Sequence, residues 1–360
     1  MKIAGREIGK NNPAYIIAEM SGNHGGSLER AKEIIHAAKE AGADCIKIQT
    51  YTADTLTIDC SNEYFRIKGS AWDGENLYSL YKRAYTPWEW HEELKAEADK
   101  LSIDFFSTPF DNSAVDFLEK IGIGFYKIAS FELVDIPLIK YVAKTGKPII
   151  MSTGMATLAE IETAVDAIRN EGNDQVALLR CASAYPAVTD EMNLRTMQNM
   201  AETFNVPVGL SDHSYGSVGA VTAVALGASI IEKHFCMGRE IETADSSFSM
   251  TPDEFAAMVK DVRQAEKAIG RVKYGASKQE KDSLAFRRSI FAVKDIKAGE
   301  KLSEDNIRVI RPGYGMEPKY YEELIGQTAL DDIERGTPLK CSSSRRSRKA
   351  SFPRAIPASR

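Results

Sequence analysis

The chain has 360 residues, of which 43% are hydrophobic and 27% charged, and its formal net charge is −5. This composition can bury a large core and still leave a second small domain, and the negative charge argues against general affinity for nucleic acids. Residues 1–12 alternate charges with glycines, and the longest uncharged apolar stretch, near Gly219–Ile231, is too short and glycine-broken to span a bilayer. We therefore expect a cytoplasmic protein with no nucleic-acid or membrane partner.

Eight short apolar runs in the first two-thirds of the chain each end in polar, often ionisable, side chains. The runs are Tyr15–Glu19, Cys45–Gln49, Ile103–Thr108, Phe125–Ser130, Pro148–Thr153, Val176–Ser183, Pro207–His213 and Ser229–His234. Stretches with helical periodicity separate them. Eight repeats of a strand and a helix predict a closed (β/α)₈ TIM barrel of the α/β class, in which the C-terminal ends of the strands build the active site.

An open, doubly wound sheet is the alternative, because polar residues at strand ends can also cap the helices that follow. Such a sheet usually carries a glycine-rich phosphate loop after its first strand. Here residues 20–27 lack the GxGxxG spacing, and the chain contains no GxxxxGK[ST] motif. We therefore predict a closed barrel over residues 1–272.

The connection after the second predicted strand, residues 50–86, is unusually long and carries several aromatic residues among charged ones. Long connections in compact domains are often lids or binding loops. The segment is either a packed excursion or a lid over the barrel mouth, and we expect a lid.

The composition of the sequence changes after the predicted barrel. A polar stretch at residues 273–286 predicts an exposed linker, and a compact module follows at residues 287–340. Residues 341–360 contain six basic residues and no acidic ones. A functional tail that binds anions is one interpretation of this segment, but we expect a disordered or aberrant end.

The compact module contains a short internal sequence repeat. Asp295–Leu302 is repeated in outline by Asp332–Leu339, so the same tight turn occurs twice. Gly299 and Gly336 leave each turn free to adopt positive φ. These turns would join short strands.

Two histidines, His213 and His234, end successive predicted strands. Adjacent strands lie about 4.8 Å apart, so both imidazoles can reach one cation. A single histidine at a strand end is more often a hydrogen-bonded structural residue, but two on neighbouring strands beside Asp212 and Glu232 favour a metal site. Such a site suits Mn²⁺, with Mg²⁺ or Co²⁺ as alternatives, acting as a Lewis acid on a carbonyl. The other histidines are His36 and His91, interpreted as structural helix residues, and His24, a loop residue left without a role.

Two lysines, Lys47 and Lys127, lie at the ends of the second and fourth predicted strands. An ammonium group in a barrel mouth can form a Schiff base or hold an anion. A Schiff-base lysine benefits from apolar isolation, whereas both lysines here lie among hydroxyls and amides, which suits a phosphate and a carboxylate. Serines of four strands favour an anion cradle over coincidental helix caps. They are Ser130, Ser152, Ser183 and Ser211.

Six segments resemble the sialic acid synthases, and the closing module resembles their antifreeze-like (SAF) domain. The segments are Ile17–Leu28, Ile46–Thr52, Tyr126–Glu132, Ser152–Met155, Gly209–Ser214 and Ile231–Phe235. The resemblance runs in order from about residue 3 to 340. Within the family, residues 47–52, Phe65–Trp72 and Leu77–Tyr81 are more similar to the pseudaminic acid branch than to the N-acetylneuraminate branch.

The resemblance implies condensation of phosphoenolpyruvate with 2,4-diacetamido-2,4,6-trideoxy-L-altrose, an N-acetylated amino-sugar aldehyde, to give pseudaminic acid and phosphate. It implies a divalent metal on His213 and His234, and a domain-swapped homodimer in which the SAF domain covers the partner's barrel. The implied catalytic residues are Glu19, Glu232, Lys47 and Lys127. The implied substrate-binding residues are Gln49, Thr108, Ser130, Ser152, Ser183, Tyr185, Ser211, Asp245 and Arg311. Ser183 departs from the Asn of the N-acetylneuraminate synthases.

Other functions stay open at this point. The nearest alternatives are an N-acetylneuraminate synthase and a legionaminic acid synthase. A Schiff-base aldolase would use Lys47 or Lys127, and a non-catalytic protein that binds sugar or ice would have a silent barrel. A silent barrel need not keep both lysines and both strand-end histidines, which argues against the last alternative.

Overall fold

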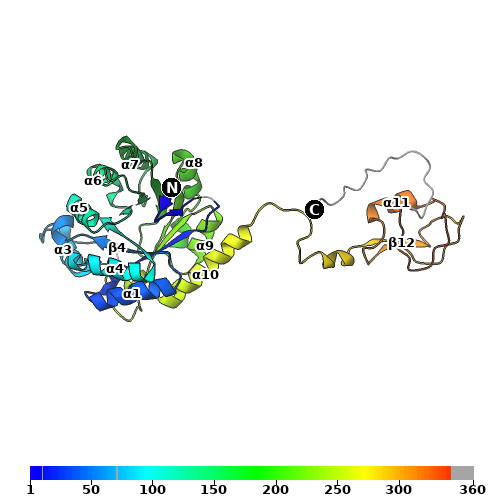
Figure 1. The fold of residues 1–360 in the computed structure, drawn as a ribbon, viewed down its shortest axis with the longest axis horizontal. Coiled ribbons are helices and arrows are strands. Elements are labelled where there is room, and N and C mark those ends of the chain that lie inside the picture. The colour runs from blue at the N-terminus through cyan, green and yellow to red at the C-terminus, as the bar shows by residue number, and fades with distance from the viewer. Residues whose placement is uncertain (10, 70–71, 342–360) are drawn as a thin grey trace. The chain divides into compact units, whose positions relative to one another are not determined.

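A computed structural model describes residues 1–9, 11–69 and 72–341 of the chain (Figure 1). The chain divides into two compact units, Met1–Gly270 and Arg271–Arg360. The predicted tail at residues 341–360 lies, apart from Cys341, outside the described residues.

The first unit is a closed barrel of eight parallel strands in the order β10-β3-β4-β5-β6-β7-β8-β9. The strands are β3 Tyr15–Glu19, β4 Cys45–Thr50, β5 Asp104–Pro109, β6 Tyr126–Ile128, β7 Ile149–Ser152, β8 Val176–Cys181, β9 Val208–Asp212 and β10 Ile230–His234. Because β10 pairs with β3 and closes the ring, the prediction of a TIM barrel is confirmed and the open sheet is wrong.

Helices alternate with these strands and form the outer layer of the barrel (Figure 1). They are α1 Leu28–Glu40, α4 His91–Leu101, α5 Asn112–Lys120, α6 Ile136–Ala143, α7 Leu158–Asn170, α8 Thr196–Phe204, α9 Val218–Ala225 and α10 Pro252–Ile269. Two further helices, α2 Ala53–Leu56 and α3 Leu77–Ala84, belong to the connection between β4 and α4. Short polar side chains fix several starts; for example, Thr157 and Glu160 form a capping box at α7, and Asp111 accepts two backbone N–H bonds at α5.

Short 3₁₀ turns complete the connections. They are η1 Ser21–His24, η2 Glu63–Phe65, η3 Trp88–Trp90, η4 Glu132–Val134, η5 Thr189–Glu191, η6 Ser246–Phe248, η7 Asp282–Phe286 and η8 Pro318–Tyr320. A two-stranded ribbon, β1 Lys2–Ile3 and β2 Arg6–Glu7, precedes the barrel. At the N-terminal ends of the strands, Asp44 accepts from Arg6 at 2.6 Å and from Arg263 at 3.1 Å, which ties this ribbon and α10 to the barrel.

The interior of the barrel is closely filled. All five side chains of β3 and all four of β7 are buried, because one face of each strand looks into the barrel and the other onto helices. Ile, Val, Leu and Phe make up most of this core, and ionisable residues enter it near the C-terminal ends of the strands. The polar ends therefore meet at one mouth.

The second unit has its own small core, in which Ile290, Leu302, Ile307 and Leu324 are buried. It contains the antiparallel pair β11 Ser289–Ala292 and β12 Ile307–Ile310, and the short helix α11 Tyr321–Leu324. Gly299 and Gly336 both have φ of 89°, as the repeated turn requires. Ile296 and Ile333 occupy equivalent positions in the two copies of the repeat. They exchange both backbone hydrogen bonds at 2.8 Å, so the two copies pair with each other.

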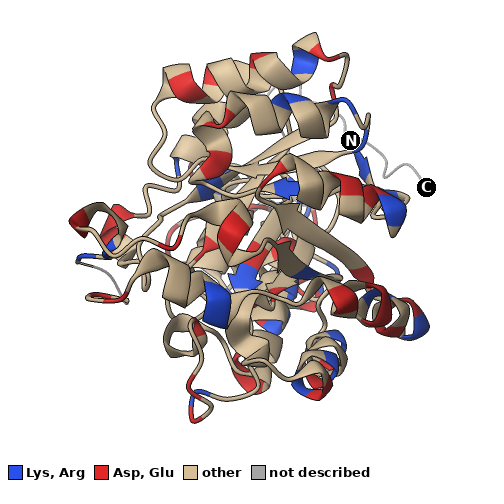
Figure 2. Cartoon of the chain, turned by 90° about the vertical axis from the view of Figure 1, so that its left-hand side faces the viewer, with Lys and Arg blue, Asp and Glu red and all other residues tan. Residues whose placement is uncertain are grey.

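Charges of both signs are interspersed over the outer helices and loops of the barrel unit (Figure 2). Within the described part of the chain, no helix is both long enough and apolar enough to cross a membrane.

Candidate active site

A cavity of about 420 Å³ opens at the C-terminal ends of the barrel strands. Gln49 of β4 and His234 of β10 line its floor, and residues of the 50–86 connection form much of its wall. The connection contributes Tyr51, Leu56, Ile67, Trp72, Leu77, Leu80, Tyr81 and Ala84. The lid interpretation is thus supported by the position of this segment.

An ionic cluster joins the first, second and last strands of the barrel. The ammonium Nζ of Lys47 lies 2.8 Å from Oε2 of Glu19 and 3.1 Å from Oε1 of Glu232. Burial alone would lower the pKa of Lys47, but the two carboxylates raise it. Burial opposes the charge of Glu232 as well, yet Lys127 and Lys47 hold its pKa below the ordinary value. Glu19 differs, because its burial outweighs the attraction of Lys47 and raises its pKa.

Lys127 is buried beside this cluster. Its Nζ donates to Oγ of Ser152 at 2.6 Å and to the carbonyl of Ile128 at 3.0 Å, and it lies 3.9 Å from Oε1 of Glu232. Burial lowers the pKa of Lys127 to about 8. Two fixed hydrogen bonds and a nearby carboxylate hold this ammonium as a donor to anions.

The predicted hydroxyl groups surround the two lysines. Thr108 lies 3.4 Å from Nζ of Lys47, and Ser211 donates to Glu232 at 3.3 Å. Ser130 and Ser183 share a hydrogen bond of 2.9 Å on the other side of the mouth. Gly154 packs closely against both serines, since a Cβ there would lie 2.5 Å from Cβ of Ser130 and 2.7 Å from Oγ of Ser183. The predicted hydroxyl groups thus come from five strands or strand ends.

The rings of His213 and His234 lie 5.3 Å apart between centroids. Nδ1 of His213 donates to the carbonyl of Ala182 at 3.0 Å, which leaves Nε2 with a free lone pair when the ring is neutral. Nδ1 of His234 and Oε2 of Glu232 are buried atoms for which no hydrogen-bond partner exists among the described residues. The free nitrogen atoms of the two histidines fit a divalent cation, and Oε2 of Glu232 stays available as an acceptor.

The protein supplies few ligands for such a cation. Among the described residues, no group of three or more His, Cys, Asp and Glu side chains is arranged to hold a metal ion. A cation held by His213 and His234 would therefore complete its shell with oxygen atoms of water or substrate, as Mn²⁺ and Mg²⁺ commonly do.

Aromatic and polar side chains border the histidines. The ring of Tyr185 lies 4.3 Å from that of His213 and 5.6 Å from that of Trp72. Asp245 is buried and accepts from the backbone N–H of Gly22 at 3.3 Å. Gln49 donates both to Glu19 at 3.2 Å and to Ser21 at 3.0 Å, which orients its amide. The structure therefore places the predicted barrel residues Gln49, Tyr185 and Asp245 on one cavity, although their roles stay predictions.

Among the polar residues of the cavity wall, Ser21 and Glu132 were not assigned to the site from the sequence. Glu132 begins η4 two residues after Ser130, and among the described residues its Oε2 is buried without a hydrogen-bond partner. Burial raises the pKa of Glu132 to about 7. The position of Glu132, two residues after the predicted strand end at Ser130, was the sequence signal that could have placed it at the mouth.

The remaining histidines take structural positions, as expected for two of them. His91 is buried in contact with Thr50, at 2.8 Å, and His36 is an exposed partner of Glu97. His24 is buried, accepts from the N–H of Gly26 at 3.1 Å and contacts Thr86 at 3.2 Å. These contacts give His24 a role in holding the loop after β3.

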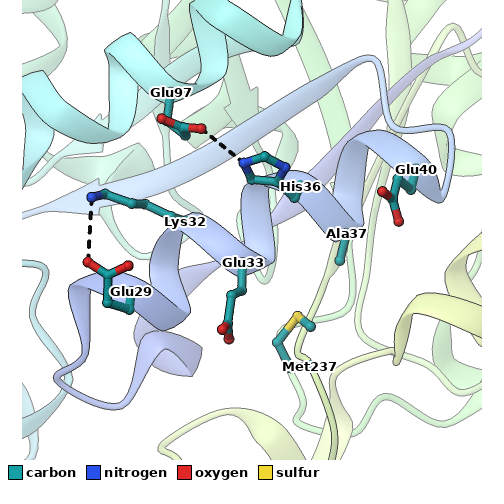
Figure 3. Close-up of a pocket in the computed structure, with 8 residues that line it drawn as sticks. All are labelled: Glu29, Lys32, Glu33, His36, Ala37, Glu40, Glu97 and Met237. Atoms are coloured by element: carbon teal, nitrogen blue, oxygen red, sulfur yellow. Dashed lines mark hydrogen bonds and ion pairs between the residues drawn. The ribbon is translucent and has the colours of Figure 1, made fainter.

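A second hollow lies outside the barrel between α1, α4 and Met237 (Figure 3). Four of its eight lining residues are glutamates, of which Glu29 pairs with Lys32 and Glu97 with His36. It lies on the helices, apart from the strand ends, and does not share a residue with the barrel cavity.

Arg311, the remaining predicted site residue, belongs to the second unit. It is exposed in the loop that follows β12. No arginine lines the barrel cavity among the described residues.

Comparison with known proteins places these features in a family context. A model of the NeuB family matches residues 34–274, and a SAF domain model matches residues 287–342. A pseudaminic acid synthase of Campylobacter jejuni subsp. jejuni (strain 81-176) is 48% identical over 92% of this chain and 96% of its own length. The pseudaminic acid synthase of Helicobacter pylori is 44% identical over 93% and 99%.

Proteins of related specificity are less similar. An N,N'-diacetyllegionaminic acid synthase of Legionella pneumophila is 36% identical over 92% of this chain and 94% of its own length. The crystal structure of an N-acetylneuraminic acid (sialic acid) synthetase from Leptospira borgpetersenii, in complex with citrate, is 33% identical, with a TM-score of 0.70 over 79% of this chain and 94% of that one.

Proposed function

Because this chain belongs to the NeuB family, we propose that it is a synthase that condenses phosphoenolpyruvate with 2,4-diacetamido-2,4,6-trideoxy-L-altrose to form pseudaminic acid and phosphate. The observation that carries this proposal is its identity of 44–48%, over more than nine-tenths of the chain, to proteins named pseudaminic acid synthase. The identity to a legionaminic acid synthase is 36%, which makes that activity the second candidate.

The lysine and hydroxyl groups supply a site for the two anionic groups of phosphoenolpyruvate. Lys47 and Lys127 are fixed as ammonium donors by buried partners, and the hydroxyl groups of Ser130 and Ser183, which bond to each other, are further donors that we assign to an anion. Hydroxyls and ammonium groups together suit a phosphate and a carboxylate better than an imine, since both lysines are held by hydrogen bonds. This arrangement argues against a Schiff-base aldolase.

A divalent metal, with Mn²⁺ as first choice, would be held by His213 and His234. When bound, it supplies a Lewis acid that polarises the sugar aldehyde. The hydrogen bond from His213 to Ala182 fixes the tautomer that presents Nε2, and the side chain of Tyr185 packs on the same ring.

In the reaction, C3 of phosphoenolpyruvate forms a bond to the aldehyde carbon, water adds at C2, and phosphate leaves by cleavage of its bond to C2. Lys47 and Lys127 offset the negative charge of the phosphate and carboxylate throughout. Glu232 faces both lysines and has a free buried oxygen, so we assign it the transfer of a proton from the attacking water. Glu19, with its raised pKa, can carry a proton to the sugar oxygen.

The lid gives the cavity a wall suited to the sugar. Leu56, Ile67, Leu77 and Leu80 are apolar, and Trp72 and Tyr81 add aromatic surface. A sugar that lacks the C6 hydroxyl and carries an added acetamido group presents a methyl group and an amide to this wall. Polar contacts from Gln49, Tyr185 and Asp245 are the ones we assign to the sugar hydroxyls.

We further propose a domain-swapped homodimer that acts in the cytoplasm, with Arg311 reaching the partner's barrel. The resemblance to the sialic acid synthases motivates this proposal; in the structure, Arg311 is exposed in the SAF unit, and the described wall of the barrel cavity contains no arginine. A guanidinium group can form two hydrogen bonds to an acyl or hydroxyl oxygen pair.

The test is an assay of phosphoenolpyruvate with a panel of N-acetylated hexoses, read by phosphate release and by product mass. We expect a strong preference in kcat/KM for 2,4-diacetamido-2,4,6-trideoxy-L-altrose over N-acetylmannosamine and over the legionaminic acid precursor. Equal or greater kcat/KM with either competitor would move the protein to that branch of the family.

A further inference from the structure

The helix-facing side of β9 and β10 contains a buried ion pair directly behind the candidate metal site. Successive side chains of a strand point to opposite faces. Ser211 and Glu232 bond to each other inside the barrel, so Asp212 and Lys233, the next residues on each strand, face the helices. They are register partners, and their side chains are 0% and 1% exposed.

The ion pair holds the turn that carries His213. Nζ of Lys233 donates to Oδ2 of Asp212 at 2.7 Å and to the backbone carbonyl of Ser214. Oδ1 of Asp212 accepts from the backbone N–H of Ser214 at 2.8 Å and from its Oγ at 2.6 Å. The residues on both sides of His213 are thus fixed by four hydrogen bonds, and the carbonyl of His213 itself accepts from Ala187 at 3.0 Å.

Helix α9 is shaped to accommodate this arrangement. Gly219 lies where a Cβ would be 3.0 Å from Oδ2 of Asp212, 3.2 Å from Oγ of Ser214 and 2.7 Å from the terminal carbon of Met192. A side chain at this position would therefore press on the carboxylate and on its hydrogen-bonded turn.

Stability alone does not account for the pair. Removing two charges from water costs several kcal/mol per ion, and well-packed apolar residues are often equal or better replacements for a buried ion pair. What the ion pair provides and apolar residues cannot provide is a set of directed hydrogen bonds to the backbone on either side of His213.

We propose that Asp212 and Lys233 are positioning residues, which hold the turn 212–214 so that Nδ1 of His213 bonds to Ala182 and Nε2 faces the site. This inference rests on the proposed function only where it names the metal. Partners of this kind, which orient a ligand without touching the metal, typically contribute 10–100-fold to metal affinity.

The experiment uses the full chain with Asp212→Leu combined with Lys233→Met. This double variant approximately keeps the buried volume and removes both charges together, but it leaves the buried N–H and carbonyl of Ser214 without these partners. We therefore expect it to fold with a lower Tm than the wild type. We expect Mn²⁺, titrated into metal-free protein by calorimetry, to bind about 10–100-fold more weakly. Asp212→Asn, which keeps the size of the side chain, serves as a second variant should the double variant not fold, with weaker Mn²⁺ binding expected again.

The control is Arg263→Met, which removes an ion pair with Asp44 at the opposite ends of the strands. It should leave Mn²⁺ affinity unchanged. Equal Mn²⁺ affinity in the wild type and in the folded Asp212 and Lys233 variants would overturn the positioning role.

A second readout separates this inference from the metal proposal. In ¹⁵N-histidine spectra of the metal-free protein, His213 should show a protonated Nδ1 in the wild type and in Arg263→Met, and should lose that defined tautomer in the double variant. If the wild type binds no Mn²⁺ but the spectra change as stated, the metal assignment fails and the positioning role stands. Unchanged spectra would overturn the positioning role even then.

Discussion

Lys47 and Glu19 are register partners on neighbouring barrel strands, and they form an ion pair of 2.8 Å in which both side chains are almost completely buried. A buried pair of this kind contributes little net stability when both partners are present, but removing one partner leaves an uncompensated charge. The pair therefore links substrate binding to the integrity of the barrel.

Lys47→Met should lower the free energy of unfolding by about 3 kcal/mol, because the buried Glu19 would lose its ammonium partner and Glu232 would keep only the contact with Lys127 at 3.9 Å. Phosphate release should fall to background. Denaturant unfolding and the phosphate assay measure the two effects. The matched control is Lys95→Met, which removes an exposed pair with Asp99 on α4 and should cost less than about 0.5 kcal/mol. A stability loss no larger than that of the control would contradict the prediction.

The metal prediction concerns His213 and His234. Excess chelator should abolish turnover, and added Mn²⁺ should restore it, because these two imidazoles are the proposed protein ligands. His213→Ala and His234→Ala should lose bound metal, measured by elemental analysis, while their circular dichroism stays that of the wild type. His36→Ala, an exposed helix position, should keep the metal. Full activity of metal-free protein in excess chelator would remove the Lewis-acid role.

Glu132 gives a prediction for the dependence of stability on pH. Its pKa rises from the ordinary 4.5 to about 7 in the folded protein. Between these two values the unfolded chain releases the proton and the folded chain keeps it, so ionisation of Glu132 destabilises the fold increasingly from pH 4.5 and fully above pH 7.

Glu132→Gln stays neutral at every pH, so its Tm should rise relative to that of the wild type as pH increases from 4.5 to 7. The corresponding gain in the free energy of unfolding is at most about 3 kcal/mol. Glu160 is the control of opposite sign, because its hydrogen bonds to Thr157 lower its pKa. Glu160→Gln should lose Tm relative to the wild type as pH rises toward 4.5, and the difference should stay level above that pH. Thermal melts of the metal-free proteins from about pH 3 to 8 would show both trends, and a constant difference for Glu132→Gln would contradict the assignment of the raised pKa.

The sequence was sufficient for the barrel because each strand is a short apolar run that ends in polar residues. Glu19, Lys47, Lys127 and His234 could be placed at one mouth on that basis alone. The start of α4 at His91 is less evident from the sequence, because the chain enters this helix through Pro87 and the 3₁₀ turn η3.

The contacts within the site could not be read from the sequence. Lys47 is shared by Glu19 and Glu232 only because β10 closes against β3, which brings together residues from the two ends of the barrel. Glu132 follows an ordinary strand end in a short 3₁₀ turn, where no periodicity marks which way a side chain points. The pairing of Asp212 with Lys233 depends on the register of β9 and β10. A shift of one residue in either strand would turn its side chains to the opposite face of the sheet.

The last prediction concerns Arg311, the exposed arginine of the SAF unit. If the domain covers the partner's barrel, water is excluded from the mouth and the guanidinium meets a sugar bound by the other subunit. Arg311→Ala should then fold and bind metal but lose most activity, and His213→Ala should be inactive for lack of metal. Mixing the two variants should restore part of the activity, because a hybrid dimer contains one barrel with both histidines that is covered by an SAF domain with Arg311.

The matched control for this complementation is Arg308→Ala, an exposed position on β12 of the same unit, which should keep full activity by itself. Subunit exchange is verified by mass spectrometry of differently tagged chains, and the oligomeric state by sedimentation at assay concentration. A monomeric enzyme, or no recovery of activity in a mixture with proven exchange, would rule out the contribution in trans, because each active barrel would then have to be completed within its own chain.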